Sequence, residues 1–292
     1  MLNRVLHTLV ITCRIFLIMC VLVLFSCTNK SYRGNEKIVV SIMPIKYLVE
    51  GIIGDDLEVA VLVPPGSSPE TYEITSGQLI ELQNARLVFT TGLIDFENEL
   101  FSKLTNNPVE LHNGIKLIEG SCGHIHSLDH HTHAHGIDPH IWTSPKQLKT
   151  MSENAYKAIS LLYPDSVKYR ENYLALIDKL DILDEEITET INRANMKTFF
   201  IYHPALTYYS NDYGLTQVAI EADGKEPSAS RLQYLVDLAH SEGITKLLYQ
   251  REFSRTAVEI IAKDIDAELI EIDPLAEDVV RNIREITRII AE

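Results

Sequence analysis

The middle of the chain holds an unusual concentration of imidazole side chains. Seven of the eleven histidines fall within seventeen positions, in the segment SCGHIHSLDHHTHAHGIDPH. Neutral imidazole is the commonest protein ligand of metals, so this tract predicts metal capture rather than a plain polar loop. Flanking glycine, serine and threonine predict a loop, residues 122–136, without fixed coordination geometry. Its histidines are His124, His126, His130, His131, His133 and His135.

A second set of candidate ligands is defined by its place relative to expected strands. In open α/β folds, ligands bind beyond the carboxyl ends of the strands. Two candidates directly follow a strand, one lies in the loop after a strand, and one closes the histidine loop. Two imidazoles and two carboxylates would form a closed site that suits Zn²⁺. The four are Glu70, His140, His203 and Asp273.

Structural roles remain as alternatives for these four residues. His140 could be a residue at the start of a helix that is hydrogen-bonded to the backbone, and His203 a hydrogen-bonded histidine of the core. Asp273 could be a turn residue, and Glu70 could cap the following turn. Because metal binding requires deprotonated imidazoles, a true site should lose affinity as the pH falls through the range near 6.5.

Short apolar runs alternate with helical patterns, which predicts an α/β fold with parallel sheets and crossover helices. Expected strands are 38–42, 57–63 and 87–91 in a first lobe and 198–202, 216–221, 246–249 and 268–272 in a second. Between the lobes, apolar residues at helical spacing over 165–194 predict one long linking helix. Two shorter helices with a break near Asp181 are the alternative.

The N-terminus predicts export. A basic start and an eleven-residue apolar run, Ile15–Phe25, are typical of a secretory signal, whereas a membrane span needs about 20 residues. The sequence LFSC resembles a bacterial lipobox, which predicts lipidation of Cys27; an ordinary signal peptide is the alternative. Only Cys122 would then remain, so no internal disulfide is expected.

These observations give the following expected organisation. Residues 1–26 are a lipoprotein signal peptide, 27–36 a tether, 37–163 an N-terminal lobe with the histidine loop, 164–195 a linking helix and 196–292 a C-terminal lobe.

Charge and missing motifs exclude several function classes. A net charge of −15 without a basic stripe argues against nucleic-acid binding. No glycine-rich phosphate loop, GxSxG elbow or HExxH helix occurs, which argues against nucleotide enzymes and common hydrolases.

Several segments together resemble the metal-binding lipoproteins of bacterial zinc and manganese ABC importers, the cluster A-I substrate-binding proteins. In chain order they are VVSIMPIKYLVEGIIGDDLEVAVLVPPGSSPETYEIT, LVFTTGLIDFE, DPHIWTSP, FFIYHPALTYYSNDYGL, LLYQREFSRTAVEIIAKDI and LIEIDPL. DPHIW and YHPALTYY are the most specific pieces, and the resemblance covers nearly the whole mature chain.

The resemblance implies two Rossmann-like lobes joined by a long rigid helix, with a metal ion between them. Carried over by motif, it implies His140 and His203 as ligands and Asp273 as the carboxylate ligand near the C-terminus. The family's first ligand is usually the histidine of a PHxYE pattern, whereas this chain reads PETYE and has Glu70 there. Tyr72, Glu73 and Tyr208 are expected to support the site or to pack.

The resemblance also implies a function. We expect a monomeric, lipid-anchored receptor at the periplasmic face of a bacterial membrane, which delivers Zn²⁺ to an ABC permease and its ATPase and is not an enzyme. Because the carboxylate oxygen of Glu70 is a harder ligand than an imidazole nitrogen, Mn²⁺ or iron is the alternative cargo. A zinc hydrolase with Glu70 as general base, or an adhesin-type surface lipoprotein with an exposed apolar patch, are alternatives from other classes. Residues 221–226 are expected at a solvated lobe edge, although the resemblance implies a loop of the cleft there.

Overall fold

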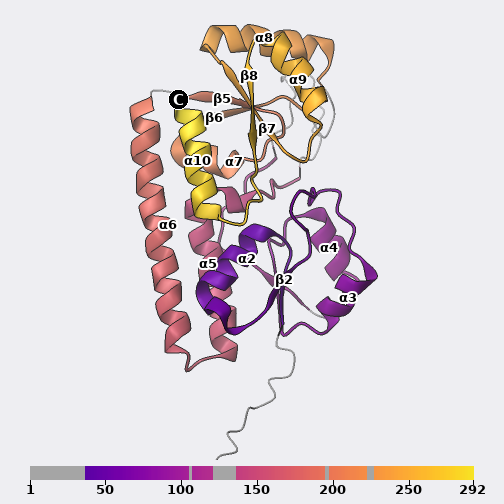
Figure 1. Ribbon diagram of the computed structural model, residues 1–292, viewed down its shortest axis with the longest axis vertical. Coiled ribbons are helices and arrows are strands. Elements are labelled where there is room, and N and C mark those ends of the chain that lie inside the picture. The colour runs from indigo at the N-terminus through magenta and orange to yellow at the C-terminus, as the bar shows by residue number, and fades with distance from the viewer. Residues whose placement is uncertain (1–36, 105–106, 121–135, 195–196, 222–226) are drawn as a thin grey trace, which may run out of the picture. The chain divides into compact units, whose positions relative to one another are not determined.

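Two parallel four-stranded sheets carry the architecture of the protein (Figure 1). The structure is a computed structural model that describes residues 37–104, 107–120, 136–194, 197–221 and 227–292. The signal, Cys27, Cys122 and the six loop histidines lie outside these residues. No helix of the described part is both long enough and apolar enough to cross a bilayer.

The first sheet has the strand order β2-β1-β3-β4. Its strands are β1 (Ile38–Val40), β2 (Val59–Val61), β3 (Leu87–Thr90) and β4 (Val109–Glu110), and its helices are α2 (Met43–Ile53), α3 (Ser76–Gln83), α4 (Asp95–Phe101) and α5 (Pro145–Leu162). All three residues of β1 are buried, as expected for a central strand covered on both faces. Ile38 and Val40 join the core toward α2 and α5, whereas Val39 joins the core on the opposite face.

The second sheet repeats this plan with the order β6-β5-β7-β8. Its strands are β5 (Thr198–Ile201), β6 (Thr216–Ala219), β7 (Lys246–Gln250) and β8 (Glu268–Ile272), and its helices are α7 (Thr207–Tyr213), α8 (Ala229–Glu242), α9 (Arg255–Asp264) and α10 (Val279–Ala291). The predicted α/β class with two parallel sheets is confirmed. Among the strands of the described residues, the sequence interpretation lacked β4, which is too short to show a periodicity.

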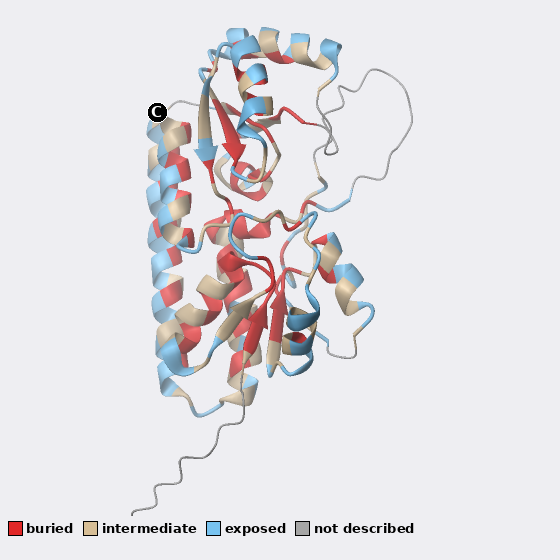
Figure 2. Ribbon diagram, turned by 45° about the vertical axis from the view of Figure 1, so that its right-hand side comes forward, coloured by how far each residue is buried: buried red, intermediate tan, exposed pale blue. Residues whose placement is uncertain are grey.

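One unbroken helix, α6 (Val167–Ala194), runs beside both sheets (Figure 1). Its buried stripe includes Leu176, Leu180 and Leu183 toward its middle, and it packs on α2, α5 and α10. Figure 2 shows these buried residues along its inner face and exposed residues along its outer face. The predicted long helix is confirmed, and the alternative with a break near Asp181 is wrong.

The two halves of residues 37–292 form one compact unit. The indole Nε1–H of Trp142, just before α5, donates to the carbonyl of Pro274, just after β8, at 3.0 Å. Ser144 and Gln147 donate to one carboxylate oxygen of Asp212 on α7 at 2.5 and 2.8 Å. These contacts hold the carboxyl ends of the strands of both sheets toward one another.

The two ends of the undescribed segment 121–135 are closed by backbone pairing. The amide of Gly120 donates to the carbonyl of Gly136 at 2.8 Å, and Glu119 and Ile137 form an antiparallel bridge. The amide of Asp138 then donates to the carbonyl of Ile118 at 2.9 Å. The backbone that leads into His140 is therefore fixed independently of the histidine loop.

Candidate metal centre

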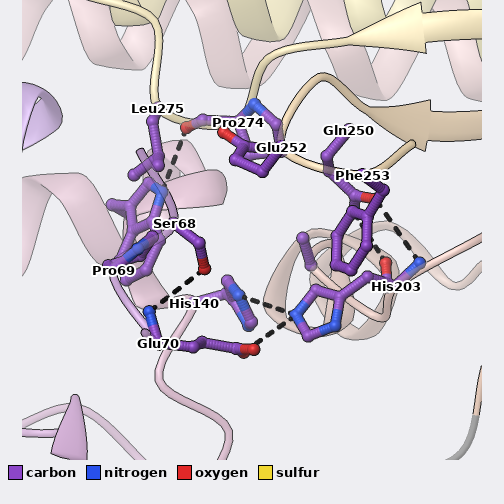
Figure 3. A pocket seen from close by; sticks show the side chains of 12 residues that line it. Ser68, Pro69, Glu70, His140, His203, Gln250, Glu252, Phe253, Pro274 and Leu275 are labelled. Carbon is purple, nitrogen blue, oxygen red and sulfur yellow. Dashed lines mark hydrogen bonds and ion pairs between the residues drawn. The ribbon is translucent and has the colours of Figure 1, made fainter. Parts of the chain in front are cut away.

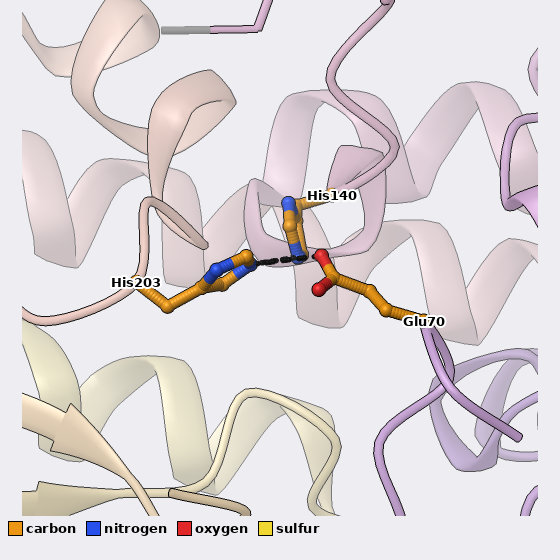
Figure 4. Close-up of side chains that lie close together, drawn as sticks. All are labelled: Glu70, His140 and His203. Carbon is orange, nitrogen blue, oxygen red and sulfur yellow. Dashed lines mark hydrogen bonds and ion pairs between the residues drawn. The ribbon is translucent and has the colours of Figure 1, made fainter. Parts of the chain in front are cut away.

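Three side chains from distant parts of the sequence meet at one point (Figure 4). One potential ligand atom each of Glu70, His140 and His203 lies within 4.8 Å of the others. The Nε2 atoms of His140 and His203 are 3.4 Å apart, and Nε2 of His203 is 3.1 Å from Oε1 of Glu70. Two imidazole nitrogens and one carboxylate oxygen at this spacing form a candidate centre for a divalent transition metal.

The carboxyl ends of the strands bring these residues together, as the sequence predicted. Glu70 lies in the loop after β2, and His203 is the second residue after β5. His140 lies at the start of a short 3-10 turn that precedes α5. His140 is buried, His203 half-buried, and Glu70 the most exposed of the three, with 43% of its side chain accessible. A cation could therefore enter from the side of Glu70.

Two buried carboxylates orient the imidazole rings. Asp138 accepts from the backbone N–H of His140 at 2.8 Å and lies 3.0 Å from its Nδ1. Nδ1 of His203 lies 2.5 Å from Oε1 of Glu221. A proton held on Nδ1 by a carboxylate leaves Nε2 as the ligand atom and raises its basicity. Both Nε2 atoms consequently face the shared point.

Glu221 corrects the sequence interpretation, which placed residues 221–226 at a solvated edge. Glu221 is only 5% exposed, and its carboxylate is satisfied by His203. Burial of an unpaired carboxylate would be costly, so this pair explains how Glu221 can lie in the interior. The rule that ligands lie beyond the carboxyl ends of strands, which found His203, applies equally to Glu221, which follows β6. Residues 222–226 lie outside the described part.

The same carboxylates determine the charge of His203. Burial alone would lower its pKa, but hydrogen bonds and charge interactions with Glu221 and Glu70 outweigh burial and raise the pKa of His203 to about 9. The hydrogen bond from His203 in turn lowers the pKa of Glu70. At neutral pH, without metal, the centre thus holds a proton on His203 between two carboxylates.

Aromatic side chains form the walls of the centre (Figure 3). The ring of Phe253 stacks on His203 with centroids 5.5 Å apart, and Trp142 lies 5.1 Å from the His140 ring. The cavity between them has a volume of about 30 Å³ and is also lined by Glu252. This room suits one ion or one water-sized group. Removal of water on the apolar side strengthens electrostatic contacts within the centre.

The structure does not bring Asp273, the fourth predicted ligand, into this group. Its Oδ2 is 3.2 Å from a guanidinium nitrogen of Arg251, and its Oδ1 accepts from the backbone N–H of Leu275 at 3.0 Å. The position of Asp273 directly after a strand predicted where its backbone lies but could not give the direction of its side chain.

The three residues expected to support the site take different roles. The hydroxyl of buried Tyr208 donates to the carbonyl of Asp138 at 3.0 Å and so holds the segment that orients His140. Tyr72 instead donates to Gln78 at 3.0 Å, and Glu73 is exposed. Only Tyr208 therefore contacts a residue of the centre.

The orienting carboxylates give a testable prediction. Glu221→Gln or Asp138→Asn should weaken Zn²⁺ binding by roughly 10- to 100-fold, because loss of the acceptor charge lowers the basicity of the ligand nitrogen. Competition with a chromophoric chelator measures the change. Glu271→Gln is the control, since Glu271 accepts from the Tyr249 hydroxyl at 2.8 Å, away from the centre. Affinities unchanged in both variants would show that the carboxylates do not act on the ligands.

Comparison with known proteins identifies relatives in sequence. The chain is 28% identical to the zinc-binding lipoprotein AdcA of Streptococcus pneumoniae over 272 residues, which are 88% of this chain and 54% of AdcA. It is 27% identical over 280 residues to a putative metal-binding protein of Chlamydia muridarum, covering 93% of this chain and 98% of that protein. The chain spans about half the length of the AdcA proteins it matches.

A solved structure and a family model cover most of the chain. A crystal structure of ZnuA superimposes with a TM-score of 0.78 and 32% sequence identity, covering 88% of this chain and 98% of that one. The model of the ZnuA family, described as zinc-uptake complex component A, periplasmic, matches residues 38–291. The chain therefore belongs to the ZnuA family.

Proposed function

We propose that the chain is an extracytoplasmic receptor that binds Zn²⁺ at the centre formed by Glu70, His140 and His203 and delivers it to an ABC permease. The observation that carries the proposal is the convergence of both Nε2 atoms and the Glu70 oxygen, with each Nδ1 occupied by a buried carboxylate. Such paired carboxylate–histidine arrangements are typical of protein zinc ligands. Family membership and zinc-binding relatives support the same cargo.

The wider setting of the receptor belongs to the same proposal. We infer export through the N-terminal signal, anchoring through a lipid on Cys27, action as a monomer with a permease and its ATPase, and collection of zinc by the histidine loop. The periplasmic description of the family and the lipoprotein AdcA support export and anchoring. The geometry of the centre favours capture of a cation over hydrolysis, because the aromatic rings of Trp142 and Phe253 leave a cavity of only about 30 Å³ beside Glu70 and the two histidines.

Titration of the metal-free protein with Zn²⁺ tests the proposal directly. A variant that lacks residues 121–135 should still bind one Zn²⁺ tightly, because the backbone of Gly120 and Gly136 is already paired and can be joined by a short linker. Calorimetry or competition with a chelator gives the stoichiometry. A variant that binds no zinc, although it folds, would place the metal in the loop and contradict the proposed centre.

Glu70 should set the preference between Zn²⁺ and Mn²⁺. A carboxylate oxygen is a harder ligand than imidazole, so Glu70→His should shift selectivity toward Zn²⁺ by about tenfold or more, the effect of ~1.4 kcal/mol in relative affinity. Competition between the two metals on one sample measures this ratio. Glu73→His is a matched control, because Glu73 is an exposed carboxylate of the same loop. An unchanged ratio would show that Glu70 is not a direct ligand.

A further inference from the structure

Glu252 is a second carboxylate at the cavity and has no role in the arrangement described above. It lies in the turn between β7 and α9, one residue before Phe253, which stacks on His203. It lines the cavity together with Glu70, His140 and His203, on the side opposite Glu70 (Figure 3). The cavity therefore has a carboxylate beside the imidazole pair, that of Glu70, and a second one across from it, that of Glu252.

One oxygen of Glu252 is unsatisfied. Its Oε1 is buried and has no hydrogen-bond partner within the described residues. Buried polar atoms without a partner are rare, because the lost hydration is not replaced, and each needs an explanation such as an ion. A divalent cation in the cavity would be such a partner.

Asp273, by contrast, has its oxygens engaged. Arg251 pairs with Oδ2, and the backbone N–H of Leu275 donates to Oδ1. To bind a metal, Asp273 would have to break an ion pair and a hydrogen bond, whereas Oε1 of Glu252 has no hydrogen bond to another described residue that it would have to break. Of the two carboxylates, Glu252 is the one that gains from a cation.

We propose that Glu252 is the fourth ligand of the cation, completing a set of two imidazole nitrogens and two carboxylate oxygens. This inference rests on the proposed function. Oε1 of Glu252 is not among the three ligand atoms that already lie together, so its side chain turns toward the cation when the metal enters. Its rotatable bonds and its position in a turn permit this movement, and two carboxylate ligands balance the charge of a divalent ion.

Paired substitutions test the assignment. Glu252→Gln should weaken binding of Zn²⁺ about 10- to 100-fold, as expected for loss of one contact to a charged group, whereas Asp273→Asn should change it less than about threefold. With Co²⁺ as a spectroscopic probe, Glu252→Gln should alter the visible d–d spectrum and Asp273→Asn should leave it unchanged. The melting temperature of the metal-free protein should not fall in Glu252→Gln, because Oε1 of Glu252 has no hydrogen-bond partner among the described residues to lose.

The outcomes separate this inference from the proposed function. If the wild type binds Zn²⁺ at the histidine pair but Glu252→Gln binds as tightly with an unchanged Co²⁺ spectrum, the fourth-ligand assignment is wrong and the receptor function stands. A large effect of Asp273→Asn alone would assign the role to Asp273. Absence of Zn²⁺ binding in the wild type would overturn the proposed function itself.

Discussion

Replacement of both centre histidines should abolish tight zinc binding. In a protein that lacks residues 121–135, His140→Ala combined with His203→Ala removes both nitrogen ligands and leaves only carboxylates. If four ligands share a binding free energy of about 10–16 kcal/mol, loss of two weakens binding by roughly 10⁴-fold or more. Chelator competition with wild-type and variant protein measures this difference.

Thermal unfolding gives a second readout of the same experiment. Zinc at about 1,000 times its dissociation constant stabilises the native state by about 4 kcal/mol, which corresponds to a rise in melting temperature on the order of 10 °C. The double variant should lose this rise. His240→Ala, an exposed histidine on α8, is the control and should keep it. Tight binding that persists in the folded double variant would show that the centre is elsewhere.

Zinc affinity should also rise steeply with pH across the neutral range. The pKa of His203 is raised to about 9, so the metal-free protein carries a proton on this imidazole at pH 7 and must release it to bind zinc. Below about pH 9, the apparent association constant should therefore increase by about tenfold per pH unit. The sequence alone predicted that affinity falls as the pH drops through the range near 6.5.

Calorimetry in buffers of different ionisation enthalpy measures the proton released on binding. About one proton per zinc is expected from His203 at pH 7.5, and Glu221→Gln should reduce this number because it removes one of the charges that raise the pKa. An affinity that is constant between pH 7.5 and 8.5 would contradict the assignment. Without metal, the pair with Glu221 and Glu70 stabilises the fold below about pH 6.5, and this contribution is lost as the pH rises through about 9.

The fold was predictable because its signals are local and repeated. Buried strands such as β1 and β5 appear as short apolar runs, and the stripe along α6 has a clear helical period. The rule that ligands lie beyond the carboxyl ends of strands located Glu70 and His203, and the end of the histidine loop located His140. Family resemblance added the expectation of one metal between the lobes, which agrees with where the cluster lies.

Side-chain direction and pairing could not be predicted in this way. The direction of the Asp273 side chain depends on its ion pair with Arg251, and the burial of Glu221 depends on its pair with His203. Each pair joins residues of two different loops. The raised pKa of His203 likewise depends on two carboxylates that are distant in sequence. The types of the candidate ligands were therefore readable from the sequence, whereas the charge state of His203 and the side-chain pairing of Asp273 required the three-dimensional arrangement.

The paired backbone of Gly120 and Gly136 has an evolutionary consequence. The chain leaves and re-enters the fold at one place, and closing a segment twice as long costs only about 0.6 kcal/mol more. A longer or shorter segment between these two glycines therefore changes the stability of the fold very little. The number of residues between these glycines can therefore change without moving the paired backbone that leads into His140.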